Sequence, residues 1–261
     1  MATFNSPSGR AAKWRRTAAL FIFFAVAGIL FVGEAANAVF AAHARMEYHR
    51  TQALLQADAD NPTNTWQFAR ACYDVADFAT NDAERALIAN QGIDASRQLI
   101  ARTPKSAPGH YYLAMDEGQL ARTELLGALA LVRDMEREFK TAVALDAAFD
   151  FAGPERNLGL LYLQAPHLGS IGSKRKAREF LERAVKHAPD YPENHLNLIE
   201  TEFQWDEPDH AKAQLNALDA IWSKAQTNFT GDAWAESWDD WIKRRAAAQK
   251  KVDENSKNSR K

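Results

Sequence analysis

The chain has 261 residues, of which 46% are apolar and 25% charged, so it is long enough for a sizeable globular domain. Ala, Leu, Glu, Lys and Arg are abundant and runs of β-branched residues are rare, which favours helix over sheet. The net charge is -2, but the charges are unevenly distributed along the chain. Both ends are basic, while residues 34–242 hold 20 basic and 32 acidic side chains. This acidic body argues against nucleic acid as a partner, since phosphate binding requires a positive surface.

The first 33 residues have the order of an export signal, a basic region followed by an apolar region. They contain four basic residues and no acid, and the run from 17 to 33, TAALFIFFAVAGILFVG, is uncharged. Two outcomes stay open: cleavage after Ala38 or Ala44, or retention of residues 17–33 as a membrane anchor. In both cases we expect residues 1–44 to be a signal sequence or anchor that directs the rest of the chain to the periplasm.

From about residue 45, apolar residues recur at three- and four-residue spacing, which is the period of a helix packed on one face. Turn residues such as Asn61-Pro62 and Gly153-Pro154 separate these segments. The pattern predicts helix pairs at about 63–103, 107–147, 150–189 and 191–225, a last helix at about 231–251, and a basic disordered tail at 252–261.

Internal repetition indicates the type of helical fold. Ala177, Leu181 and Ala184 recur 34 residues later, as alanine or leucine at 211, 215 and 218. A period of 34 residues is that of tetratricopeptide repeats, each of which is a helix–turn–helix. Small residues such as Gly159 allow the two helices of a pair to pack closely. We therefore predict an all-α, tetratricopeptide-like α-solenoid of about four helix pairs over residues 45–251.

The last predicted helix carries Trp234, Trp238 and Trp241 at positions i, i+4 and i+7, which lie on one helical face. We expect this face to cover the open end of the repeat stack, because terminal repeats need a cap. The alternative is that the tryptophans form a binding surface. The single cysteine, Cys72, lies in a helical pattern and is expected to be a small core residue.

A longer segment carries a family resemblance. Residues 153–198, GPERNLGLLYLQAPHLGSIGSKRKAREFLERAVKHAPDYPENHLNL, and the GQLAR motif at 118–122 resemble the T component of tetratricopeptide-associated TRAP transporters, the tripartite ATP-independent periplasmic systems. The similarity covers roughly 60–225. It implies a periplasmic protein that partners the TRAP solute-binding protein, forms a homo-oligomer and holds an apolar ligand. The chain departs from the family in lacking a lipoprotein cysteine and in having Ala147 where a proline is usual.

The first helix of each pair lines the concave side of a tetratricopeptide stack, so its exposed aromatic and polar residues are candidates for binding. An inserted turn at 164–173 adds polar residues, because such insertions often gather on a functional face. The candidate ligand- or partner-binding residues are Tyr111, Tyr112, Met115, Gln119, Tyr162, His167, Ser170 and Phe203. Tyr162 also suits a packing position, and Ser173 suits the N-cap of the next helix.

The sequence contains no metal-ligand pair of the HExxH kind, no glycine-rich phosphate loop and no G-x-S-x-G motif. We therefore expect no enzymatic activity, no catalytic residue, no metal and no cofactor. Two functions remain. The first is a T-component-like role in solute uptake, and the alternative is a membrane-tethered scaffold that assembles envelope proteins and holds no small molecule.

Overall fold

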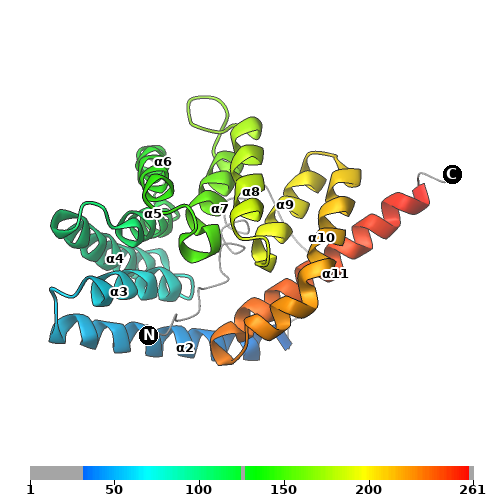
Figure 1. Cartoon of the computed structure of the whole chain (residues 1–261). Coiled ribbons are helices and arrows are strands. Elements are labelled where there is room, and N and C mark those ends of the chain that lie inside the picture. The colour runs from blue at the N-terminus through cyan, green and yellow to red at the C-terminus, as the bar shows by residue number, and fades with distance from the viewer. Residues whose placement is uncertain (1–31, 125–126, 259–261) are drawn as a thin grey trace. The chain divides into compact units, whose positions relative to one another are not determined.

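The computed structural model describes residues 32–124 and 127–258, and every regular element in these ranges is a helix (Figure 1). The helices are α2 (Val32–Ala57), α3 (Pro62–Ala76), α4 (Asp82–Arg102), α5 (Ala107–Ala121), α6 (Ala128–Leu145), α7 (Phe149–Gln164), α8 (Lys174–His187), α9 (Pro192–Gln204), α10 (Pro208–Asn228) and α11 (Ala235–Asn258), with a short 3-10 helix, η2 (Asp232–Trp234). The prediction of an all-helical fold is confirmed. The predicted pairs correspond to α3/α4, α5/α6, α7/α8 and α9/α10, but the described ranges hold ten α-helices, which is more than four pairs and a cap.

The additional helix is α2, which begins before the predicted boundary at residue 44. It packs on α3, because Ala44 and Thr51 are buried and the ring of Tyr48 lies 5.5 Å from that of Phe68. The predicted anchor lies almost entirely outside the described residues. None of the helices in 32–124 and 127–258 combines the length and the apolarity that crossing a membrane requires.

Local sequence explains where the helices begin. The Asn61 side chain accepts hydrogen bonds from the backbone amides of Thr63 and Asn64, and Ser106 accepts one from Gly109. Ser173 accepts a hydrogen bond from the Lys176 amide, so it is the N-cap of α8. These side chains satisfy amides that have no partner inside the helix. A proline in the first turn of α3, α5, α9 and α10 fits the same positions, because its missing N–H is not needed there.

The described residues form two compact units, where the sequence predicts one domain over 45–251. The N-terminal unit contains residues 32–149 and the loop 164–172, and the C-terminal unit contains 150–163 and 173–258. The division falls at a left-handed turn, since Asp150, Phe151 and Ala152 have φ values of 51°, 54° and 60°. The guanidinium of Arg156 and the amide of Asn194 both donate to the Phe151 carbonyl, each at 3.1 Å, and so hold this strained turn.

The C-terminal unit has an aromatic core that α11 completes. Trp241 is fully buried, Trp234 is 8% exposed and Trp238 is partly buried against the same cluster. The Trp234 and Trp241 rings lie within 6.3 Å of the Tyr191 ring. The tryptophan stripe therefore packs inside this unit, as expected for a cap. The helix continues to Asn258, beyond its predicted end at 251, because Val252 is also buried in this core.

Gly159 on α7 marks a close approach to α8. A Cβ atom at this position would lie 2.8 Å from Cγ and 3.1 Å from the backbone nitrogen of Leu181, which is itself fully buried. Replacing Gly159 by alanine is therefore expected to lower the free energy of unfolding by about 1–3 kcal/mol. Chemical denaturation measures this change. A stabilised variant would contradict the prediction, because glycine to alanine in an uncrowded helix normally raises stability.

Candidate partner-binding surface

Helices α3 and α5, the first helices of neighbouring pairs, bring together an aromatic cluster in the N-terminal unit. The Trp66 ring is parallel to the Tyr112 ring, with centroids 6.0 Å apart, and Phe149 lies edge-on to both at 6.1 Å. Tyr111 contacts Tyr112 and Phe149, with centroids 4.9 and 5.6 Å apart. Trp66 and Phe149 are half-buried, so they form the accessible part of this cluster.

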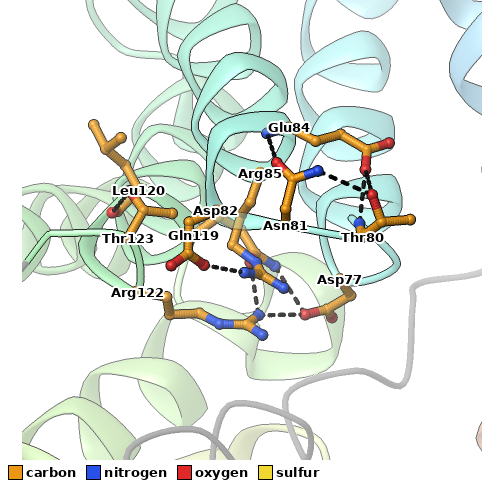
Figure 2. Close-up of polar contacts among 10 residues, drawn as sticks. All are labelled: Asp77, Thr80, Asn81, Asp82, Glu84, Arg85, Gln119, Leu120, Arg122 and Thr123. Atoms are coloured by element: carbon orange, nitrogen blue, oxygen red, sulfur yellow. Dashed lines mark hydrogen bonds and ion pairs between the residues drawn. The ribbon is translucent and has the colours of Figure 1, made fainter.

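A polar network connects the C-terminal ends of α3 and α5 (Figure 2). The Gln119 side-chain amide donates to the backbone carbonyl of Tyr73 at 3.2 Å and to the Asp77 carboxylate at 3.1 Å. The Arg122 guanidinium donates to Asp77 at 2.6 Å and to the Gln119 side-chain oxygen at 2.7 Å. This network ties the end of α3 to the end of α5. It leaves Gln119 fully engaged within the protein.

Between the aromatic cluster and this network, α5 carries two buried acids. Asp116 is fully buried against the backbone of Gly92, and neither carboxylate oxygen has a hydrogen-bond partner among the described residues. Burial and the nearby Asp74 carboxylate raise the pKa of Asp116 well above its ordinary value. Burial also raises the pKa of Glu117 to about 7, with smaller contributions from Asp134 and Glu138. The Glu117 carboxyl is therefore sensitive to pH near neutrality.

The candidate residues on α5 lie deeper than the sequence suggests. Tyr111, Tyr112 and Met115 are 1%, 3% and 6% exposed, and Gln119 is fully buried. Their side chains lie in the interior beneath the aromatic cluster, and Trp66 contributes the accessible ring of that cluster. The binding role of these four residues stays a prediction.

The other four candidates lie outside α5. In the C-terminal unit, Tyr162 is fully buried, with its ring stacked on Phe180, and the half-buried Phe203 ring lies 5.3 Å from the Lys251 ammonium. In the loop 164–172, the side chain of His167 is exposed, whereas the Ser170 hydroxyl is buried and has no partner among the described residues. Four of the eight candidates, Tyr111, Tyr112, Met115 and Gln119, share helix α5 in the N-terminal unit.

We call the aromatic cluster of Trp66, Tyr111, Tyr112 and Phe149 the α3/α5 surface. The candidate set contains neither Trp66 nor Asp77 nor Arg122, although Arg122 is the last residue of the GQLAR motif at 118–122. Arg122 lies three residues after Gln119, a spacing that places both on one helical face and could have drawn attention to it. Within the described residues, no group of three or more His, Cys, Asp or Glu side chains is arranged to hold a metal ion.

Comparisons with known proteins address the fold. Neither a protein-family model nor a curated protein sequence matches this chain. Among solved structures, it is similar to TTC0263, a thermophilic tetratricopeptide protein of Thermus thermophilus, with a TM-score of 0.56 and 20% identity over 77% of this chain and 88% of that chain. The chain has a tetratricopeptide-like fold. MamA follows with a TM-score of 0.47 and 15% identity over 76% of this chain and 98% of that one. Yeast Tom70 has a TM-score of 0.31 and 10% identity over 96% of this chain and 66% of that one.

Proposed function

We propose that this tetratricopeptide-like chain is a non-enzymatic, partner-binding component of a TRAP-type solute uptake system, exported and facing the periplasm. The α3/α5 surface supports the binding role, because stacked helical repeats present such surfaces to partner proteins. The resemblance of residues 153–198 to T components supports the TRAP solute-binding protein as the partner. The basic and apolar order of the first 33 residues supports export.

The observation that carries the proposal is the position of Trp66. Its ring is half-buried, held parallel to Tyr112 and edge-on to Phe149, so it is rigid before any partner arrives. Binding energy in protein interfaces concentrates in such anchored aromatic residues, with tryptophan among the most frequent. Preorganisation also reduces the entropy lost on association.

The alternative function, a membrane-tethered scaffold without a small-molecule ligand, is favoured by one observation. Tyr111, Tyr112 and Met115 are each at most 6% exposed, so their side chains are already occupied by packing within the protein. Native mass spectrometry of the full-length chain distinguishes the two functions, since it reports a retained apolar molecule and the homo-oligomer mass together. A chain that carries no ligand and binds no TRAP solute-binding protein would support the scaffold.

Replacing Trp66 by alanine is expected to weaken binding of the solute-binding protein about 30-fold, which corresponds to roughly 2 kcal/mol for an interface tryptophan. Biolayer interferometry with the full-length chain measures the affinity. Trp66→Phe, which keeps an aromatic ring in the cluster, should retain most of it. Leu87→Ala on α4 is the matched control, because Leu87 is 63% exposed in the same unit. Equal losses for Leu87→Ala and Trp66→Ala would contradict a site on α3.

A further inference from the structure

Helix α2 has two different faces. Ala44 and Thr51 are buried on the face toward α3. On the opposite face Val39, Ala42, Met46 and Ala53 are exposed, at spacings of three, four and seven residues that form one stripe along the helix. Val39 and Met46 are 65% and 57% exposed, among the most exposed large apolar side chains in the described part of the chain.

Cationic and neutral polar side chains border this stripe. Arg45 and His49 lie on one side of it by helical position, and His43 and Arg50 lie on the other, all of them exposed. The acidic residue between 38 and 57 is Glu47, whose carboxylate pairs with Arg50 at 2.8 Å. This segment is therefore weakly basic in a body where acids outnumber bases by 12.

The stripe is also close in sequence to the apolar segment that precedes it. Helix α2 begins at Val32, inside the uncharged run 17–33. At a rise of 1.5 Å per residue, the helix brings Val39 within about 10 Å of Val32. A bilayer that holds the apolar run would therefore lie beside the first turns of α2.

We propose that the outer face of α2, defined by Val39, Ala42, Met46 and Ala53, lies on the surface of a membrane rich in anionic lipid. An apolar stripe bordered by arginines is the pattern of helices that lie in the plane of the bilayer interface. The apolar side chains enter the boundary between headgroups and acyl chains, while the arginines bind lipid phosphates. The position of the bilayer in this inference rests on the export segment of the proposed function.

The test uses the full-length chain in vesicles of phosphatidylcholine with and without phosphatidylglycerol. In a Cys72→Ala background, an environment-sensitive fluorophore is attached through Ala42→Cys or Ala53→Cys, and its quenching by lipids that carry a nitroxide on the acyl chain is measured. Leu87→Cys provides the matched control, since Leu87 is exposed on α4 of the same unit. Flotation of the vesicles reports separately whether the chain is anchored.

We expect both α2 labels to be quenched several-fold more than the Leu87 label in the anionic vesicles. Arg45→Gln and Arg50→Gln should each weaken this contact about fivefold, because one cation at an anionic surface contributes about that factor. An anchored chain whose α2 labels behave like the Leu87 label would overturn the proposal and leave export intact. A chain that does not float with the vesicles would overturn both. The fluorophores on α2 could also be shielded from water to the same extent in vesicles without phosphatidylglycerol, or in detergent. That result would indicate that a second copy of the chain covers this face instead.

Discussion

Replacing Arg244 by methionine is expected to lower the free energy of unfolding of the C-terminal unit by about 3–5 kcal/mol, because it leaves the buried Glu193 carboxylate without its cation. The Arg244 guanidinium donates to Glu193 and Glu200 at 2.7 Å and to Asp240 at 3.0 Å. Glu193 is fully buried, and its other oxygen accepts from the Trp241 indole at 2.8 Å. The arginine therefore joins the cap α11 to α9.

The next residue provides a control for this substitution. Arg245 pairs with Asp219 at 2.7 Å, but both side chains are more than a third exposed. Exposed pairs contribute about 0–1 kcal/mol, since water and salt screen them. Chemical denaturation of Arg244→Met and Arg245→Met should therefore differ by several kcal/mol. Similar losses for both would show that the Arg244 network does not hold α11 in place.

The second large effect concerns pH and the buried acids of α5. Burial raises the pKa of Glu117 from 4.5 to about 7, so the folded chain keeps a proton there that the unfolded chain has lost. The stabilisation that this proton contributes is fully present below about pH 4.5 and is lost as the pH rises through 7. The free energy of unfolding falls by about 3 kcal/mol over this range. The raised pKa of Asp116 acts in the same direction.

Glu117→Gln removes this titration while keeping the shape of the side chain. The variant should be about 3 kcal/mol more stable than the natural chain near pH 8, and nearly equal to it near pH 5. Hydrogen exchange of α5 amides measures the difference within the N-terminal unit. Glu124→Gln, which changes an exposed carboxylate of the same unit, controls for net charge. A constant difference between the two pH values would contradict a proton held by Glu117.

Much of the helical architecture could be predicted because its causes are local. Asn61, Ser106 and Ser173 lie at the beginnings of helices and bind amides two or three residues away, so short windows of sequence reveal them. The 34-residue repetition and Gly159 predict helix pairs of the tetratricopeptide type, since only a small residue permits that approach.

The candidate site could be predicted less well. Tyr111, Tyr112 and Gln119 were correctly placed on a first helix, but periodicity does not distinguish a side chain facing a groove from one packed beneath it. The deciding contacts join residues far apart in sequence, such as Gln119 and Asp77, which are 42 positions apart. Asp116 likewise becomes unusual only because Gly92 on another helix lies against its carboxylate.

The amino-acid sequence by itself determined the helical class, the helix pairs and most of their ends, because helical period and capping depend on residues within one or two turns. Only the tertiary structure decided that α2 packs on α3, that Asp150–Ala152 form a left-handed turn, and that Arg244 pairs with the buried Glu193. In the sequence Arg244 is one of several basic residues near the end of the predicted helix 231–251, yet its partner Glu193 lies 51 residues earlier. The physical reason is that ion pairing and burial depend on which helices pack together, and neighbouring residues in the chain do not specify that.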